Sequence, residues 1–335
     1  MQFKNFIGID VSKDTLDLCV VIDGKTHHHY RIKNTVKEIK STLTKMLQSL
    51  NGSYYDTVFC MEHTGIYNIP LVKWLHENGA HMWLESGVHI RRSLGLVRGK
   101  NDKVDSARIA MFAFVNRHQI RLWNPPRKVI DRLSVLLSQR SRLIKAKKQL
   151  QTANREQKRF IDKDIMKSLN NYTNRTVAVI EKQIIDLEKE IKEVIRSDEK
   201  LLRLFKVMTS ISGIGFVTAC YVLVTTNEFI NINDPKKYAC YCGVAPFEHS
   251  SGTSIKGKNR VSHFANKSIK TLFHLASMSA IGTPGDLRDY YYRKVEEGKN
   301  KMSVLNAIRN KLILRIFACV RENKIFEKNY TYSLA

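Results

Sequence analysis

The sequence predicts an α/β domain at the N-terminus, followed by a long helical region and a mainly α-helical C-terminal part. Three observations lead to this prediction. In the first third of the chain, short apolar runs rich in β-branched residues alternate with segments of helical periodicity. The dipeptide Pro125-Pro126 then breaks the pattern. Beyond it, apolar residues recur at helical spacing almost to the end of the chain.

The first region opens with a predicted β-hairpin over residues 6–21, FIGIDVSKDTLDLCVV. Two apolar runs flank Ser12, Lys13, Asp14 and Thr15, which are typical turn residues. Asp10 stands where the first strand leaves the core, so its carboxylate can face solvent and bind a hard cation through oxygen. Taken alone, this stretch is equally consistent with Asp10 as a simple turn residue.

Three further acidic residues follow the other elements of this region. Glu62 directly follows a short buried strand, whereas Asp102 and Asp105 open a helix and share one face of it. Ligands collect at the carboxyl ends of strands in open α/β sheets, so Asp10 and Glu62 could meet the helical pair there. Four converging carboxylates repel each other unless cations neutralise them, which favours a divalent metal site. The expected strands are residues 28–32, 57–61 and 81–85, and the expected helices are residues 36–50, 69–78 and 101–114.

The middle region predicts a hairpin of two long helices. The first carries a loose heptad of leucines, which ordinary core packing explains. The second has an unbroken 3-4-3-4-3 spacing, the pattern of a coiled-coil seam that packs internally or against a second subunit, with dimerisation favoured. We expect polar residues 160–174 to form the reversal between the helices. The two stripes are Leu133, Leu136, Leu143 and Leu150, and Val177, Ile180, Ile184, Leu187, Ile191 and Val194.

The C-terminal region combines a glycine-containing turn with a serine-rich loop. Gly213 and Gly215 have the spacing of a helix-hairpin-helix turn, whose backbone amides can receive a phosphate. Residues 241–260 read as a flexible Ser/Gly loop among basic residues, and a hydroxyl among cations suits attack on a phosphodiester. On composition alone, an ordinary phosphate-binding loop explains it better. Helices are expected over residues 268–278, 286–296 and 303–323; the flanking cations are Lys256, Lys258, Arg260 and Lys267.

The charge of the chain points to a polyanionic partner. Lysine and arginine number 56 against 31 acidic residues, a net charge of +25, and the surplus is spread over the whole chain. No apolar run approaches the ~20 residues of a membrane span, no signal peptide is evident, and no basic amphipathic helix stands beside aromatic anchors. We therefore expect a cytoplasmic protein that binds nucleic acid and not a membrane. The pair Cys240 and Cys242 is too close for a typical zinc site.

The acidic and serine-containing motifs together resemble a known family. GID at Asp10, MEHTG at Glu62, KNDKVDSARIA at Asp102 and Asp105, and the later block GVAPFEHSSGTSIKGKNRVSHFANKSIK stand in the order and spacing of the DEDD transposases of the insertion-sequence-110 family, relatives of the Piv-type DNA invertases. The resemblance covers nearly the whole chain. One departure is Phe247, where the family often has a basic residue after the proline.

The resemblance implies a RuvC-like domain of the ribonuclease H fold over residues 1–124, a coiled-coil hairpin over 125–200 and a transposase domain over 201–335. It implies an oligomeric enzyme, a dimer or tetramer, that joins an insertion element to target DNA under guidance of a structured RNA. The four acids would hold Mg²⁺ or Mn²⁺. Ser251, directly before glycine, would attack the phosphodiester and form a covalent phosphoserine link, with Ser250 and Ser254 as the neighbouring alternatives.

Other functions remain compatible with parts of the pattern. A metal-dependent nuclease of RuvC type would use the same four acids with water as the nucleophile, and only a covalent protein–DNA species separates the two enzymes. A non-catalytic nucleic-acid-binding scaffold would carry the acids incidentally. An actin-like ATPase can also open with GID, but it requires glycine-rich phosphate loops that the first region lacks.

Overall fold

The computed structural model describes residues 3–93, 95, 101–251, 255–261 and 264–327. The chain divides into two compact units, Met1–Pro125 and Pro126–Ala335. The boundary coincides with the proline pair that breaks the sequence pattern. The helical hairpin and the C-terminal helices both belong to the second unit, so the finer division into three domains stays a prediction.

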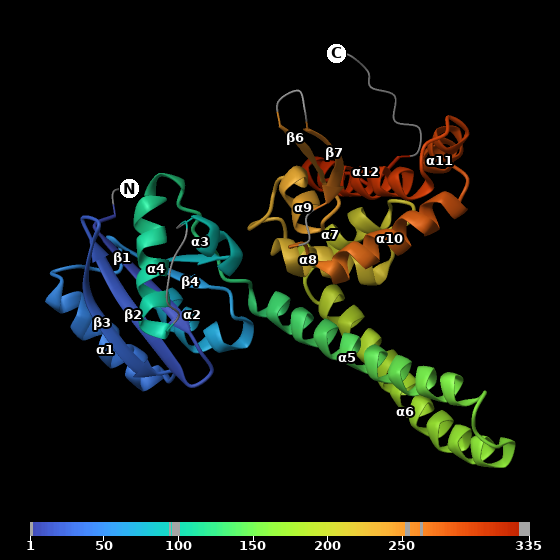
Figure 1. Ribbon diagram of the computed structural model, residues 1–335, viewed down its shortest axis with the longest axis horizontal. Coiled ribbons are helices and arrows are strands. Elements are labelled where there is room, and N and C mark those ends of the chain that lie inside the picture. The colour runs from blue at the N-terminus through green and yellow to red at the C-terminus, as the bar shows by residue number, and fades with distance from the viewer. Residues whose placement is uncertain (1–2, 94, 96–100, 252–254, 262–263, 328–335) are drawn as a thin grey trace. The chain divides into compact units, whose positions relative to one another are not determined.

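The first unit contains a five-stranded mixed sheet with the order β3-β2-β1-β4-β5 (Figure 1). β1 pairs antiparallel with β2 and β2 with β3, whereas β1, β4 and β5 run parallel. An antiparallel hairpin joined to parallel strands in this order is the arrangement of a ribonuclease H-like domain, so the predicted α/β class is confirmed. The strands are β1 Asn5–Val11, β2 Thr15–Ile22, β3 Lys25–Lys33, β4 Thr57–Glu62 and β5 His81–Glu85.

Helices cover both faces of this sheet. Side chains alternate between the faces along β1, so Ile7 and Ile9 join a core with the two helices that precede β5, whereas Phe6 packs with the helices that follow it. The helix α3 and the short 3₁₀ turns η1 and η2 lie where no helix was expected. The helices are α1 Val36–Ser49, η1 Gly65–Asn68, α2 Ile69–Glu77, α3 Gly87–Ser93, α4 Asp102–Val115 and η2 Arg117–Gln119.

The second unit begins with the antiparallel hairpin of α5 Lys128–Gln157 and α6 Lys163–Arg196 (Figure 1). Ion pairs cross between the helices, at 2.7 Å from Arg140 to Glu188 and 2.6 Å from Lys147 to Glu181. The apolar seam of α6 is fully buried within the chain only toward its two ends, at Val177, Ile191 and Val194.

The reversal lies only partly within the predicted residues 160–174 and is much shorter, because α6 already begins at Lys163. The side chain of Asp162 caps this helix by accepting a hydrogen bond from the backbone N–H of Asp164 at 2.9 Å. Polar residues had suggested a loop, but they are equally suited to a helix whose surface faces solvent. The reversal therefore occupies only residues 158–162.

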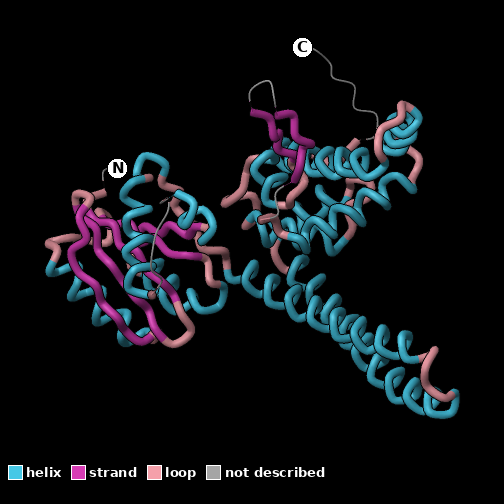
Figure 2. The backbone as a smooth tube through the Cα atoms, in the orientation of Figure 1, coloured by secondary structure: helices cyan, strands magenta, loops and turns pink. Residues whose placement is uncertain are grey.

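The rest of the second unit is mainly helical, with one two-stranded ribbon (Figure 2). Its core is centred on buried residues such as Phe273, Ile308 and Leu312. The expected flexible Ser/Gly loop is wrong over most of its length, because its two sides pair as antiparallel strands. The elements are α7 Glu199–Thr209, α8 Phe216–Thr226, α9 Pro235–Tyr241, β6 Pro246–Ser251, β7 Ile255–Val261, α10 Lys267–Gly282, α11 Asp286–Glu296 and α12 Lys301–Glu322.

The two glycines of the predicted helix-hairpin-helix motif lie in the turn between α7 and α8. Gly213 has a φ of +93°, and a Cβ there would lie 2.5 Å from the carbonyl oxygen of Ala276 and 2.9 Å from the Cβ of Ala280. Glycine thus allows both the left-handed backbone and the close approach of α10. A phosphate-binding role for this turn stays a prediction.

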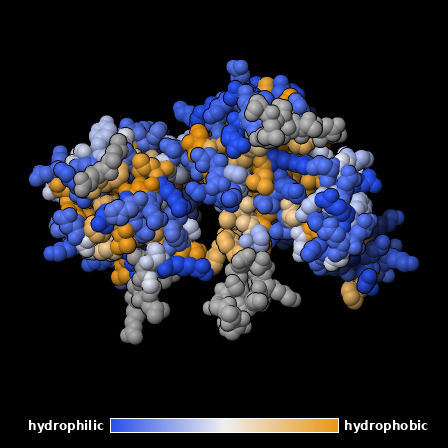
Figure 3. Space-filling view, turned by 90° about the horizontal axis from the view of Figure 1, so that it is seen from above, coloured by the Kyte–Doolittle hydropathy of each residue, from blue (hydrophilic) through white to orange (hydrophobic). Residues whose placement is uncertain are grey.

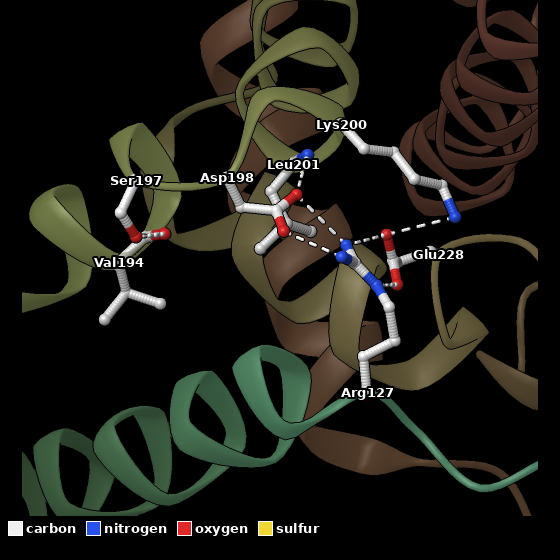
Figure 4. Close-up of polar contacts among 7 residues, drawn as sticks. All are labelled: Arg127, Val194, Ser197, Asp198, Lys200, Leu201 and Glu228. Atoms are coloured by element: carbon white, nitrogen blue, oxygen red, sulfur yellow. Dashed lines mark hydrogen bonds and ion pairs between the residues drawn. The ribbon is translucent and has the colours of Figure 1, made fainter.

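An ion-pair network centred on the buried Glu228 ties the start of α5 to the start of α7 and the end of α8 (Figure 4). Arg127 donates two hydrogen bonds to Glu228, at 2.6 and 2.7 Å, and two to Asp198, at 2.7 and 3.0 Å. Lys200 lies 3.2 Å from Glu228, whose side chain is fully buried. Burial acts to raise the pKa of Glu228, but the hydrogen bonds from Arg127 and Lys200 outweigh it and hold the pKa below its ordinary value.

Hydrophilic residues cover most of the face shown in Figure 3. Within the described part of the chain, no helix is both long enough and apolar enough to span a bilayer.

Candidate active site

A missing side chain on β1 sets the position of helix α4. A Cβ on Gly8 would lie 2.1 Å from the backbone nitrogen of Ala110 and 2.3 Å from the carbonyl oxygen of Ser106, so only glycine lets α4 lie directly on the strand. Side chains two residues apart share one face of a strand, and therefore Asp10 lies on the face that α4 covers. Asp102 stands one helical turn before Ser106. The GID motif thus brings the start of α4 toward Asp10.

Asp10 and Glu62 stand at matching ends of neighbouring parallel strands. The β1–β4 register runs to the pair Ile9 and Met61, and the two acids are the next residue of each strand. Both carboxylates therefore leave the sheet at its carboxyl-end edge, as the sequence predicted.

Packing and hydrogen bonds fix the turn that follows Glu62. The side-chain amide of Asn68 donates to the backbone carbonyl of Glu62 at 2.9 Å, and its carbonyl accepts from the backbone N–H of Thr64 at 2.8 Å. Gly87, at the start of α3, makes room for the Glu62 carboxylate, because a Cβ there would lie 2.3 Å from one of its oxygens. The acid is therefore confined between β4 and α3.

Asp102 and Asp105 lie in the first turn of α4, where Asn101 caps the helix by accepting from the backbone N–H of Val104 at 2.8 Å. Each acid pairs with an arginine. Arg31 of β3 lies 3.3 Å from Asp102, and Arg108, one turn further along α4, lies 2.7 Å from Asp105.

The other three predicted acids lie close enough to Asp10 to influence its pKa. Burial, the largest cause, and the nearby charges of Asp105, Asp102, Glu62 and Asp17, in that order of influence, together raise the pKa of Asp10 to about 6. Oxygen donors that repel each other suit a hard divalent cation, so the donor set fits such an ion. As the described side chains stand, however, no three His, Cys, Asp or Glu residues form a group that could hold a metal. The arginine partners of α4 would have to release their acids.

Asp17 is a fifth acid that the sequence reasoning missed. It faces Asp10 across the β1–β2 pair, and it is 2 % exposed. His29 lies 2.9 Å from its carboxylate and Arg31 lies 3.8 Å away, so β3 supplies the compensating donors. The available signal was an acid inside the apolar run LDLCVV, directly opposite Asp10 in the predicted hairpin. Arg31 contacts both Asp17 and Asp102 and thereby links β2, β3 and α4.

The predicted nucleophile lies in the second unit. Ser251 is the last residue of β6 and pairs through its backbone with Ile255, while Ser250 pairs with Lys256. Ser254 lies outside the described residues. The backbone therefore places Ser251 beside the tip of a β-hairpin, with the basic run of β7 on the opposite strand.

Two family models match the chain. A transposase model of the DEDD IS110 type matches residues 7–158, and the model described as "Transposase IS116/IS110/IS902 family" matches residues 206–292. The first match includes all four acids. The second includes the β6–β7 hairpin with Ser251.

Curated relatives align with most of the chain to different extents. The pilin gene-inverting protein of Moraxella lacunata is 26 % identical over 329 residues, covering 97 % of this chain and 98 % of the relative. The transposase for insertion sequence element IS1111A of Coxiella burnetii is 24 % identical, covering 75 % of this chain and 71 % of the relative. Among solved structures, RuvC of T. thermophilus in complex with a Holliday junction substrate matches 34 % of this chain and 95 % of its own, with 13 % identity and a TM-score of 0.28.

Proposed function

Since this chain belongs to the IS110 family of DEDD transposases, enzymes that recombine DNA, we propose that it joins an insertion element to target DNA through a covalent serine intermediate. The observation that carries the proposal is the position of Asp10 and Glu62 at one edge of the first unit's sheet, with Asp102 and Asp105 close enough to raise the pKa of Asp10. A structured RNA guides the choice of target, and the chain acts as a homo-oligomer. The net charge of +25 supports extensive contact with nucleic acid.

The four acids hold divalent metal, Mg²⁺ or Mn²⁺, through carboxylate oxygens. Such an ion supplies charge that polarises the phosphate and stabilises the developing negative charge. Asp10 is half-buried, so its carboxylate is partly shielded from solvent at this edge of the sheet. Arg31 and Arg108 hold Asp102 and Asp105 before the metal binds, so they keep the two carboxylates oriented.

Ser251 acts as the nucleophile. Its hydroxyl loses a proton, its oxygen forms a bond to phosphorus, and the bond from phosphorus to one strand oxygen breaks. The departing oxygen takes a proton and leaves as a hydroxyl. Attack by the hydroxyl of a different strand reverses these steps, releases the serine and reseals the DNA without an external energy source.

The relatives favour strand exchange over hydrolysis. The Moraxella protein is named for inverting a gene, and an inverted segment must be rejoined to its flanks as well as cut. A nuclease that uses water would break the strands without conserving the bond. Transferred to this chain, the relative's activity supports a covalent intermediate.

A trapping assay tests the proposal. The full-length protein, its co-expressed RNA, Mg²⁺ and labelled DNA carrying the element junction are incubated and then separated on a denaturing gel. We expect a protein–DNA adduct that is absent in Ser251→Ala and in Asp10→Asn. Ser250→Ala, one residue away on the same strand, serves as the matched control and should retain the adduct.

The other outcomes discriminate between the remaining mechanisms. An adduct that persists in Ser251→Ala but disappears in Ser250→Ala or Ser254→Ala moves the nucleophile to that residue. Cleaved DNA without any adduct makes the enzyme a hydrolytic nuclease. Full activity of Asp10→Asn would show that the converging acids are incidental and would favour a scaffold.

A further inference from the structure

A group of basic side chains in the second unit forms no ion pair with an acid of the described residues. Arg309 of α12 is 5 % exposed, and its Nε is buried without a hydrogen-bond partner. Among the described residues, no carboxylate forms an ion pair with Arg309 or with Lys270 of α10. Buried cations are normally paired, because an isolated charge loses its hydration without compensation.

Hydrogen bonds fix the group in one arrangement. The guanidinium of Arg309 donates to Nδ1 of His274 at 2.8 Å and to the side-chain oxygen of Asn306 at 3.3 Å. Because arginine can only donate, Nδ1 of His274 must accept, and the proton of the neutral imidazole resides on Nε2. His274 therefore presents an N–H donor whose orientation Arg309 controls.

The electrostatic state of the group agrees with this geometry. Burial and the charge of Arg309 lower the pKa of both Lys270 and His274, and burial lowers the pKa of Arg309 itself. Lys270 and His274 are four residues apart on α10, so they project from one face of the helix. Positive charges held together in this way lack the anion that would relieve their repulsion.

The group is attached to both ends of the β6–β7 hairpin. Asn306 donates to the backbone carbonyl of Val244 at 2.7 Å, two residues before β6 begins. Lys270 lies near the start of α10, the element that follows β7. The capping residue Asn266 bonds to Tyr241 through its side chain at 3.1 Å and its backbone at 2.8 Å. The chain thus passes from Val244, which is bonded to α12, into the strand that carries Ser251. After β7 it continues into α10, which carries Lys270 and His274.

We propose that Lys270 and His274, with Arg309 as their positioning residue, bind a phosphate of the nucleic acid beside the β6–β7 hairpin. The inference deepens the proposed function and rests on it, because it assigns these side chains to the DNA on which the serine acts. Lys270 supplies the charge, His274 donates from Nε2, and the Arg309 charge adds attraction without direct contact. The negative charge of the bound phosphate would compensate the buried guanidinium of Arg309, which forms no ion pair among the described residues.

Inorganic phosphate is the first probe. In thermal unfolding of the full-length protein, phosphate should raise the melting temperature more than chloride at equal ionic strength, because it binds the folded state. We expect the additional rise in melting temperature caused by phosphate to be lost in Lys270→Gln and kept in Lys299→Gln. Lys299 is an exposed lysine between α11 and α12, so the control removes the same charge elsewhere. Equal gains in the two variants would overturn the proposal.

DNA binding provides the second measurement. Loss of one charged phosphate contact should weaken affinity about tenfold and reduce the salt dependence by about one ion. We expect this for Lys270→Gln but not for Lys299→Gln. Arg309→Gln should weaken binding similarly, and Arg309→Lys should restore part of the loss, because it keeps the charge. A role of Arg309 in packing alone would leave the DNA affinity of folded Arg309→Gln unchanged.

The failure of this inference can be told apart from failure of the proposed function. If Lys270→Gln binds phosphate and DNA as the wild type does while Ser251→Ala still abolishes the adduct, the phosphate site is wrong and the serine mechanism stands. If the wild type forms no adduct but Lys270→Gln loses phosphate stabilisation, the site stands and the serine mechanism fails.

Discussion

Asp10→Asn should stabilise the metal-free protein, although it removes a residue needed for activity. At neutral pH the ionised Asp10 carboxylate is half-buried beside other acids, and the variant removes that charge. The pKa rises from 3.8 to about 6 on folding. At about 1.4 kcal/mol per pKa unit, this corresponds to about 3 kcal/mol for a fully buried group, and solvent screening reduces it to roughly 1–2 kcal/mol.

The pH dependence follows from the raised pKa. Below pH 3.8, Asp10 is protonated in the folded and unfolded states, and its charge imposes no penalty. The penalty grows as the pH rises and is complete above about 6. The stability gained by Asp10→Asn should therefore be largest at pH 8 and small at pH 4. Mg²⁺ should reduce the difference in unfolding free energy between Asp10→Asn and the wild type, because it stabilises the wild type more than the variant.

The tryptophans make the measurement specific to the correct unit. Trp74, Trp83 and Trp123 are the three tryptophans of the chain, and all lie in Met1–Pro125. Their fluorescence, measured during urea unfolding in the presence of a metal chelator, therefore reports the unfolding of the first unit. Asp14→Asn, at an exposed turn residue of the same β-hairpin, is the matched control. A gain that is absent at pH 8, or equal at pH 4 and pH 8, would refute the reasoning.

The remaining predictions concern packing and ion pairs. Arg127→Ala should destabilise the second unit by about 1–3 kcal/mol, because it removes the bidentate partner of the buried Glu228 carboxylate, whereas solvent exposure of Arg127 and the remaining contact with Lys200 limit the loss. In helical circular dichroism, the double variant with Glu228→Gln should lose less than the sum of the single losses. Gly8→Ala should displace α4, lowering both stability and DNA recombination, since the added Cβ meets backbone atoms. Gly87→Ala should impair recombination with little change in unfolding, because the three atoms nearest to its Cβ belong to the movable end of Glu62. Equal effects of the two glycine variants on stability would contradict this distinction.

Much of the first unit could be predicted because its local signals agree with its tertiary structure. The short apolar strands, their turns and the acids at their ends each have a distinct pattern, and parallel strands bring their carboxyl ends to one edge. Asp10 and Glu62 were placed correctly for this reason. Asp17 was not predicted as part of the site, because its buried carboxylate is compensated by His29 and Arg31, and only the pairing of β2 with β3 brings these residues close.

The second unit was harder to predict because polarity alone does not distinguish loops from exposed helices and strands. Residues 163–174 are polar and yet belong to α6, where their side chains face solvent. The residues around Ser251 contain serine and glycine and yet form paired strands, because a two-stranded ribbon gains its hydrogen bonds from pairing that composition does not reveal. Likewise, Arg309 gave no signal in sequence, since only the packing of α10 against α12 buries it.

The α5–α6 hairpin has a length that can be compared with DNA. α6 has 34 residues, and at 1.5 Å per residue it extends about 50 Å. B-form DNA rises about 3.4 Å per base pair, so the arm spans the length of about 15 base pairs. Removing one heptad from each helix shortens the arm by about 10 Å, or about three base pairs, while keeping the faces of the two helices in register. Heptads taken from beside the reversal therefore change the length of the hairpin in defined steps and leave the core residues Leu133, Leu137, Ile191 and Val194 in place.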